Sequence, residues 1–142
     1  MHISQITLTL NNKPGKLSGI SELMGSESLN IRAISVVDQG EKSIIRFIVE
    51  DPEKATNALA AQNYEYSVAR VLAVEVPDHS GGLSAVLKPL KEQEINVDYM
   101  YPAIGRHGNN AILIIGTKDI EKAAEVLPAN YIHLLGEEVY HL

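Results

Sequence analysis

An internal repeat constrains the fold of this 142-residue chain more than any other feature of its sequence. The stretches NNKPGKLSGI and PDHSGGLSAV place a glycine and a leucine at matching positions, and the matching residues are 66 positions apart. Apolar positions keep the same offset, as expected when one buried pattern occurs twice. The matching pairs are Gly15 with Gly81, Leu17 with Leu83, Ile20 with Val86, Met24 with Leu90, Asn30 with Asn96, and Ile31 with Val97. The sequence therefore predicts two copies of one small module.

In the second half of each copy the offset grows to 68, so that Asp51 matches Asp119. The second copy must therefore hold two extra residues. The segment GRHGNN at 105–110 is the most economical place for them, because its glycines and asparagines favour a hairpin loop. Its counterpart in the first copy is the shorter DQGEK at 38–42.

Hydrophobic periodicity predicts the order of elements in the first copy. Apolar residues alternate with polar ones at 6–10, as in a half-buried strand, and then recur at helical spacing at 17–24. Two strand-like segments, 31–37 and 43–50, flank the short hairpin. Pro52 then suits the first turn of a second helix. This order is βαββα and needs one more strand.

The last strand has to come from residues 66–76, yet the end of this segment also aligns with the first strand of the second copy. We therefore expect the modules, at 1–70 and 71–142, to be joined without a flexible linker; an exchange of strands between them is the alternative. The βαββαβ order predicts an α+β fold. It consists of two ferredoxin-like modules in tandem, each an antiparallel sheet with its helices on one face.

The predicted strand at 31–37 carries apolar side chains on both faces. With regular alternation, Ile34 and Val36 lie on one face, and Ile31, Ala33 and Val37 lie on the other. The helix-free face is then apolar as well. We expect it to be covered by the other module or by a second chain.

Pro89 is an irregularity in the first helix of the second copy. Its ring crowds the preceding turn and its nitrogen carries no hydrogen, so we expect the helix to be kinked or shortened there. A local kink without function is the simpler interpretation, and a functional hinge is the alternative.

The composition narrows the choice of partners. A net charge of −6 argues against an extended nucleic-acid surface or an anionic membrane surface. The absence of cysteine excludes disulfides and thiolate chemistry and suits a reducing cytoplasm, where we expect the protein to act. The N-terminal stretch alternates polar and apolar residues, unlike a secretory signal, and runs such as 111–115 are too short to span a membrane.

The two glycine-containing turns suggest an anion site. A turn before a helix leaves backbone amides exposed at the positive end of the helix dipole, where a carboxylate is stabilised. Gly15, and Gly81 with Gly82, would let a ligand approach the main chain, because no Cβ intervenes. Asn12 and Asp78 align at the start of these loops, where an oxygen could accept a hydrogen bond from a ligand ammonium. The alternative is that these two side chains only cap the helices.

Asn30 and Asn96 each lead into the strand that follows the helix. Their amides offer a donor and an acceptor to a zwitterion. Alternatively, each asparagine ends the turn by bonding to its own backbone.

The chain resembles the ACT domain, a small ligand-binding module attached to many enzymes of amino-acid metabolism. NNKPGKL with the LNI at 29–31 looks like one copy, and PDHSGGL with the INV at 95–97 looks like a second, so that the resemblance covers nearly the whole chain. The resemblance implies a ligand site formed by Asn12, Pro14, Gly15, Leu17, Asn30, Ile31, Asp78, His79, Ser80, Gly81, Gly82, Leu83, Asn96 and Val97. The second copy has Ser80 in place of Pro14, and the first has Lys16 where a small residue is frequent, so the two sites need not both bind.

In that family, amino-acid effectors often bind between two modules. The resemblance implies that the carboxylate faces the amides of one helix N-terminus, that the ammonium meets an asparagine or aspartate, and that the side chain lies between modules. Tyr99 and Tyr101 share a predicted strand face with Val97 and are candidates for the wall of that site; the alternative is that they are ordinary, partly exposed tyrosines.

Other classes of function fit less well. His79 lies between Asp78 and Ser80, but adjacent residues need not face one another, and we expect no catalysis. No histidine pair has a recognised metal-ligand spacing, and no nucleotide-binding glycine pattern occurs, so we expect neither a metal nor a cofactor. An RNA-recognition module would need an aromatic, basic central strand, which this acidic chain lacks.

We therefore predict a non-catalytic sensor that binds an amino acid. With two modules filling the chain, we expect it to act in trans on a separate metabolic enzyme, and we expect two chains to associate as a homodimer. The alternative is a ligand-free regulatory subunit that pairs with an enzyme through its sheets.

Overall fold

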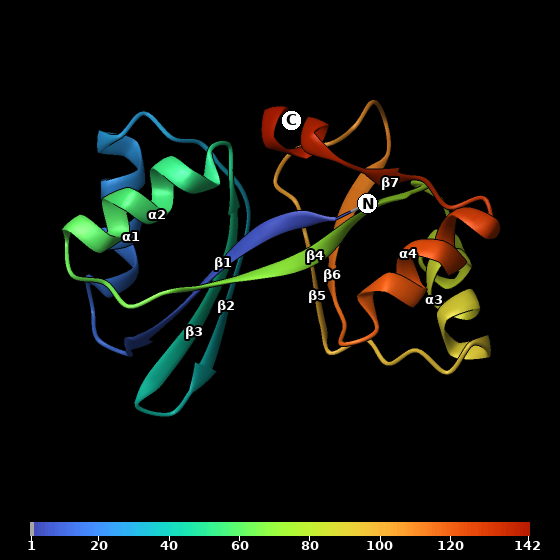
Figure 1. The fold of residues 1–142 in the computed structure, drawn as a ribbon, viewed down its shortest axis with the longest axis horizontal. Coiled ribbons are helices and arrows are strands. Elements are labelled where there is room, and N and C mark those ends of the chain that lie inside the picture. The colour runs from blue at the N-terminus through green and yellow to red at the C-terminus, as the bar shows by residue number, and fades with distance from the viewer. Residues whose placement is uncertain (1) are drawn as a thin grey trace. The chain divides into compact units, whose positions relative to one another are not determined.

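The structure, a computed structural model, describes residues 2–142 (Figure 1). Its elements follow the predicted order twice. They are β1 (Ile3–Asn11), α1 (Lys16–Ser26), β2 (Ile31–Gln39), β3 (Lys42–Val49), α2 (Pro52–Ala61), β4 (Ser67–Val76), α3 (Gly82–Glu92), β5 (Tyr99–Pro102), β6 (Ala111–Gly116), α4 (Ile120–Ala129), β7 (Leu134–Leu135) and the 3-10 helix η1 (Glu137–His141). In the described part of the chain, no helix is long and apolar enough to cross a lipid bilayer.

The chain divides into two compact units, and the first is formed by Ser4–Ala69. Its strands run in the order β2-β3-β1 with antiparallel pairing. Helices α1 and α2 lie on one face of these strands (Figure 1). Between the helices and the sheet is a buried apolar cluster made of Ile6, Leu8, Ile20, Met24, Leu29, Ile45, Phe47, Val49, Ala55 and Leu59.

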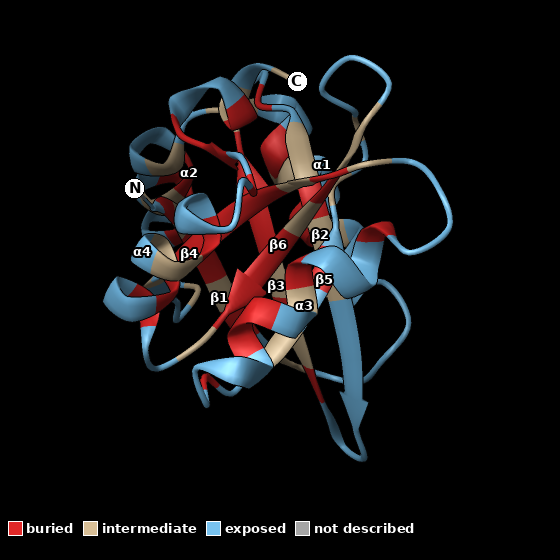
Figure 2. Cartoon of the chain, turned by 90° about the vertical axis from the view of Figure 1, so that its right-hand side faces the viewer, coloured by how far each residue is buried: buried red, intermediate tan, exposed pale blue. Residues whose placement is uncertain are grey.

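The second unit contains Arg70–Leu142 together with residues 2 and 3. Here β4 pairs with β6 and with the short β7, and β6 pairs with β5. Strands β4 and β6 are largely buried (Figure 2). Helices α3 and α4 cover one face, over a cluster of Leu72, Val74, Val76, Val86, Leu90, Ile95, Ile115, Ile120, Ala123, Leu127, Ile132 and Leu134.

Strand β4 belongs to both copies of the repeat. It is one uninterrupted ten-residue strand that begins in the first unit and ends in the second. It lies next to β1 in the first module and next to β6 in the second. The predicted absence of a linker is therefore confirmed. One strand serves both modules. That the first copy ends at residue 70 and the second begins at residue 71 is therefore a proposal.

The predicted faces of β2 are partly wrong. The pairing of β2 with β3 shifts register between Ile31 and Ala33, which is a local bulge. Because the bulge resets the alternation of side chains, Ile31 and Ile34 both pack against the core of the first module, although regular alternation would separate them. Val36 and Val37 are 47% and 40% exposed.

Pro89 does not shorten its helix. Helix α3 has 11 residues, as many as α1, and the Gln93 amide donates to the Pro89 carbonyl oxygen at its end. Proline removes one amide from the hydrogen-bond ladder, and burial of Pro89 offsets part of this cost.

The hairpins differ as the change of offset predicts. Strands β2 and β3 are separated by only two residues, whereas β5 ends at Pro102 and the loop 103–110 precedes β6. An isolated bridge between His107 and Asn110 orders the tip of this loop. The longer hairpin loop of the second module is confirmed.

Candidate functional site

The two duplicated loops enter their helices through the same backbone turn. Gly15 precedes α1 with φ 88°, and Gly81 precedes α3 with φ 86°; both are left-handed conformations that favour glycine. No side chain among the described residues caps either helix. The interpretation of Asn12 and Asp78 as simple caps is therefore wrong, and amides of both first helical turns stay available to an acceptor.

Asn12 and Asp78 instead fasten each loop to the hairpin of its own module. Nδ2 of Asn12 donates to Oδ1 of Asp38 at 3.0 Å and to the carbonyl oxygen of Gly40 at 3.3 Å. In the second module, Nη1 of Arg106 donates to Oδ2 of Asp78 at 3.1 Å. Among residues 2–142, no group donates a hydrogen bond to the side-chain oxygen of Asn12.

Gly82 has a packing role within its loop. A Cβ at this buried residue would collide with the carbonyl oxygen of Pro77, so packing alone requires glycine there, and the approach of a ligand to Gly82 stays a prediction. A Cβ at Gly15 or Gly81 would meet nothing within 4 Å. Those two glycines are required by their positive φ angles.

The remaining loop residues lie at the surface. Leu17 and Leu83 are 40% and 43% exposed, so neither side chain belongs to the core. The helical spacing of apolar residues had suggested a core position for Leu17. Pro14 and Ser80 are also exposed. Nδ1 of His79 lies 2.8 Å from the carbonyl oxygen of Ser80, so the polar contact of the ring is with its own loop, whereas the carboxylate of Asp78 pairs with Arg106.

A small hollow lies beside the first loop. It has a volume of about 100 Å³, and its lining combines four apolar side chains with amides, lysines and one serine. The lining residues are Leu10, Asn11, Asn12, Lys13, Lys16, Leu17, Val36, Ser43 and Ile45. A shallower hollow of about 400 Å³ adjoins it at Asn11, Asn12, Lys13 and Glu41. Sequence reasoning missed Ser43, because its only signal is a hydroxyl within an otherwise apolar strand face.

Comparison with known proteins identifies the modules. The family model described as an ACT domain pair matches residues 1–141. The chain belongs to the ACT domain family. A solved structure of a protein from Bacteroides thetaiotaomicron is 29% identical to this chain, covers 100% of this chain and 98% of its own, and superposes with a TM-score of 0.93.

A more distant likeness supports the fold alone. The regulatory subunit of aspartate kinase from Thermus thermophilus, in its ligand-free form, is 15% identical; the match covers 90% of this chain and 89% of that one with a TM-score of 0.65. No match was found among curated proteins.

The asparagines at the strand entrances of the ACT modules do not bond to their own backbones. The left-handed residues that end the helices are Ser28 and Glu94, two positions earlier. Nδ2 of Asn96 donates to Oδ1 of Asp98 at 3.0 Å, and the backbone amide of Asn30 donates to Oε1 of Glu50 at 3.1 Å. The alternative that these asparagines only close a turn is wrong.

The residues that follow these asparagines point into the ACT cores. Ile31 and Val97 each pack against the helix-side cluster of their own module. Met100 pairs with Ile115 of that cluster, so Tyr99 and Tyr101 project to the opposite face. The predicted common face of Val97 with the tyrosines is therefore wrong, because regular alternation begins only at Tyr99. The tyrosine rings stack with centroids 6.5 Å apart.

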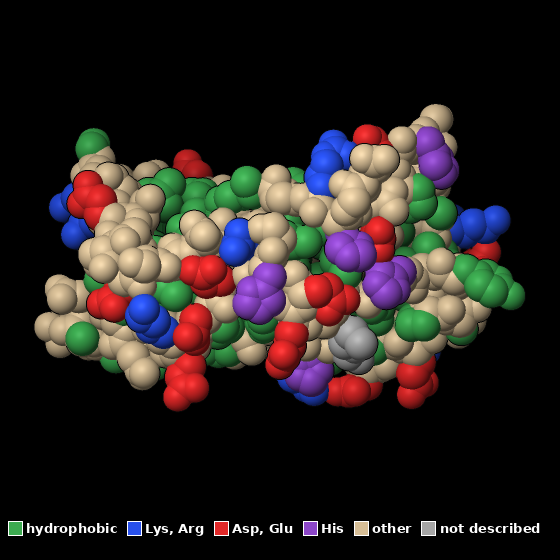
Figure 3. Space-filling model, turned by 90° about the horizontal axis from the view of Figure 1, so that it is seen from above, with side chains coloured by type: hydrophobic (Ala, Val, Ile, Leu, Met, Phe, Trp, Pro, Cys, Tyr) green, Lys and Arg blue, Asp and Glu red, His purple; other side chains and the backbone are tan. Residues whose placement is uncertain are grey.

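The second ACT module also contains a cluster around Glu75. Its Oε1 accepts from Nδ2 of Asn110 at 2.8 Å and lies 3.3 Å from Nδ1 of His107, while Oε2 lies 3.8 Å from Nε2 of His133. Figure 3 shows histidine side chains gathered beside acidic ones on one face. Within residues 2–142, no group of histidine, aspartate or glutamate side chains has an arrangement that could hold a metal ion.

The hydrogen bond from Asn110 lowers the pKa of Glu75 below its usual value; burial opposes this change, and the two histidines add to the lowering. A carboxyl whose pKa is lower in the folded state stabilises the fold above its unfolded pKa, and this stabilisation is lost as the pH falls through the folded pKa. The Glu75 cluster should therefore make the second module less stable in acid.

We expect Glu75→Gln to lower the free energy of unfolding at pH 7 by about 1.5 kcal/mol, the scale of a hydrogen bond to a charged group. At pH 3 the variant and the parent should differ less, because the parent carboxyl is protonated to a greater extent there than at pH 7. Urea denaturation at both pH values measures this. Glu121→Gln is the control, since that carboxylate forms an exposed pair with Arg70 and should matter by less than about 0.5 kcal/mol. An equal loss at both pH values would contradict the assignment.

Proposed function

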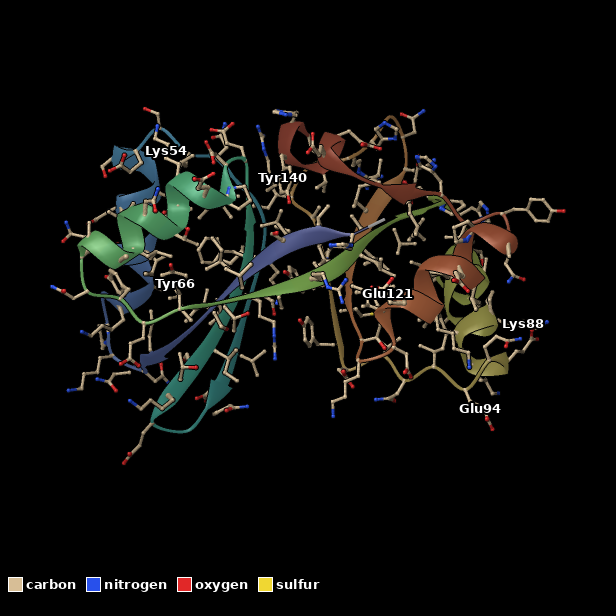
Figure 4. The ribbon with its side chains drawn as sticks, viewed as in Figure 1. Lys54, Tyr66, Lys88, Glu94, Glu121 and Tyr140 are labelled. Atoms are coloured by element: carbon tan, nitrogen blue, oxygen red, sulfur yellow. The ribbon has the colours of Figure 1, made fainter. Side chains whose placement is uncertain are left out.

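We propose that this ACT domain pair is a non-catalytic regulatory protein that binds a free amino acid at its glycine-containing loops. The observation that supports this most directly is that both α1 and α3 begin after a left-handed glycine and lack a side-chain cap. Amides at such a helix start stabilise a carboxylate. The charged side chains labelled on the helices of the second module, Lys88 and Glu121, are exposed (Figure 4).

In the first module, the carboxylate of the ligand would accept hydrogen bonds from the amides of Leu17 and Ser18. Its ammonium would donate to the side-chain oxygen of Asn12, which the contact with Asp38 already orients. Asp78 would supply the corresponding oxygen in the second module. That the side chain of the ligand lies between modules stays a prediction.

Regulation follows from the ligand binding one arrangement of the protein more tightly than another. The regulated partner would be a separate metabolic enzyme; the likeness to a regulatory subunit of aspartate kinase supports action in trans. We propose that the protein acts in the cytoplasm as a homodimer, and sedimentation that finds only monomers would contradict the dimer.

The test is calorimetric titration with each of the twenty amino acids. We expect at least one to bind, and we expect Gly15→Ala or Gly81→Ala to weaken that binding at least tenfold, because alanine disfavours the left-handed turn that aims the amides. Gly108→Ala is the matched control: it has φ 62°, has free space for a Cβ, and lies outside both loops. Unchanged binding in both loop variants would contradict the site, and no heat with any amino acid would contradict the function.

A ligand-free regulatory subunit is the second candidate. The observation that favours it is the exposure of Val36 and Val37 on β2, which ends the strand order of its module. An exposed apolar strand at a sheet edge is suited to pairing with another chain. This candidate predicts binding to an enzyme that is unaffected by every amino acid in the titration.

A further inference from the structure

The tip of the loop 103–110 in the second module is held by the carboxylate of Glu75. Its Oε1 accepts from Nδ2 of Asn110 at 2.8 Å and lies 3.3 Å from Nδ1 of His107. These two loop residues also bond to each other, because the backbone amide of each donates to the carbonyl oxygen of the other. The side chain of Glu75 is only 15% exposed, whereas residues 106–109 lie at the surface. The contacts of Glu75 therefore fasten an exposed loop to β4.

A second histidine reaches the same carboxylate from another segment. Nε2 of His133, just before β7, lies 3.8 Å from Oε2 of Glu75. The rings of His107 and His133 have centroids 6.3 Å apart and an angle of 23° between their planes. Among residues 2–142, these two histidines are the titratable groups that act on Glu75, and the strands paired with β4 add no other charge. The cluster thus places one anion beside two groups that can both become cations.

The charge of this cluster changes sign as the pH falls. Imidazole groups take up protons at higher pH than carboxyl groups do. While Glu75 is ionised, it offsets the positive charge of a neighbouring histidine. Once Glu75 is protonated as well, the hydrogen bond from Asn110 is no longer charge-assisted, and two like charges face each other without an anion between them. The loop is therefore held more weakly in acid.

The linkage between Glu75 and the loop has the sign that this requires. The hydrogen bond from Asn110, a loop residue, is the largest cause that lowers the pKa of Glu75. The ionised carboxylate must then stabilise the closed loop in return. This stabilisation is present above the pKa that Glu75 has when the loop is open, and it is lost as the pH falls through the lowered pKa.

The same loop also holds the second glycine turn, residues 77–81. Nη1 of Arg106 donates to Oδ2 of Asp78 and to the carbonyl oxygen of Asn109, both at 3.1 Å. Arg106 directly precedes His107, so displacement of the loop tip also displaces this guanidinium. Asp78 would then lose its partner on the loop.

We propose that the loop 103–110 is a pH-sensitive switch: protonation of Glu75 opens the loop while the core of the second module stays folded, and the opening releases the turn at 77–81. This inference goes beyond the proposed function and does not depend on any ligand. An exposed loop held by few contacts opens at a lower free energy than the core does. The core strands β4 and β6, by contrast, contribute fully buried residues such as Leu72 and Ile115.

The test is hydrogen exchange of the full chain between pH 7 and pH 2.5, expressed as protection factors to remove the effect of pH on the chemical step. We expect the amides of His107 and Asn110 to lose about tenfold in protection in acid, the scale of one hydrogen bond to a charged group. The amide of Gly82, which donates to the His79 carbonyl oxygen at the end of the turn, should lose protection with them. The amides of β4 and β6 should keep theirs.

Glu75→Gln imitates the protonated carboxyl, because it keeps the shape of the side chain and removes its charge. In this variant, the same three amides should exchange about tenfold faster than in the wild type already at pH 7, and their protection should no longer change between pH 5 and pH 2.5. Glu121→Gln removes an exposed carboxylate of α4 and is the control; its profile should match that of the wild type.

His133→Gln separates the charge effect from a loss of packing. It removes one of the two like charges and leaves the hydrogen bond from Asn110 in place, so the loss of protection between pH 5 and pH 2.5 should be several-fold smaller than in the wild type. His2→Gln is the control, since His2 is exposed and does not act on Glu75.

Three results would overturn the switch. They are a loop that stays protected at pH 2.5, a loop and core strands that lose protection together, and a Glu75→Gln variant that exchanges like the wild type at pH 7. If the loop opens but Gly82 keeps its protection, the release of the turn is overturned.

Discussion

Gly82→Ala is expected to lower the free energy of unfolding by about 3 kcal/mol, at the upper end of the usual cost of overpacking. The new Cβ would collide with the carbonyl oxygen of Pro77 and come within 3.4 Å of Cγ1 of Val76. The main obstacle is backbone, so it cannot rotate away as a flexible side chain would. The same carbonyl also accepts from the His79 amide at 2.9 Å, and moving it would weaken that turn.

Gly25→Ala is the matched control for this substitution. Gly25 also lies in a helix, but a Cβ there would meet nothing within 4 Å. Alanine has the higher helix propensity, so this variant should be more stable by about 0.5–1 kcal/mol. Urea denaturation of both variants measures the contrast. A loss below about 1 kcal/mol for Gly82→Ala would mean that the loop yields, and that the glycine is not required for packing.

The repeat made most of the fold predictable. Matching positions 66 apart indicated two copies of one hydrophobic pattern. The change of offset to 68 placed the extra residues at 105–110, and these residues lie in the hairpin loop 103–110 of the structure. The shared role of β4 followed from the same alignment, because residues 66–76 had to close one copy and open the next. These features depend on local periodicity, which a single sequence carries directly.

The details of the site depend on contacts between distant residues, which periodicity does not carry. The partners of Asn12 are 26 and 28 positions away, and the partner of Asp78 is 28 positions away. In the structure, these two side chains bond to the hairpins and do not cap the helices, as the simpler prediction had them do. The bulge between Ile31 and Ala33 likewise has no signal in the hydrophobic pattern. Because of this bulge, the side chain of Ile31 packs against the core of the first module.

The duplication also conceals a chemical difference. The two loops share a glycine conformation and an uncapped helix, so alignment alone suggests two equivalent sites. The surrounding strands come from other parts of each copy, and only the first brings a buried serine and lysines to the loop.

Phe47→Ala is expected to cause the largest loss of stability, about 4 kcal/mol. Phe47 is the only phenylalanine in the chain, is fully buried, and lies in the core of the first module between the helices and the sheet. Alanine would remove most of a large apolar side chain and leave a cavity, and both terms are unfavourable. Chemical denaturation measures the loss, and hydrogen exchange should show that amides in residues 4–69 lose protection.

The repeat supplies the control for this prediction, because the equivalent position in the second module is Ile115, which is also fully buried. Phe47→Ile therefore introduces a side chain that this fold already accommodates at the matching site. It removes less apolar volume, so it should cost about 1.5 kcal/mol, less than half the loss for alanine. Equal losses of unfolding free energy for isoleucine and alanine would contradict this prediction. The core of the first module would then not accept the side chain that the second module has at the matching position.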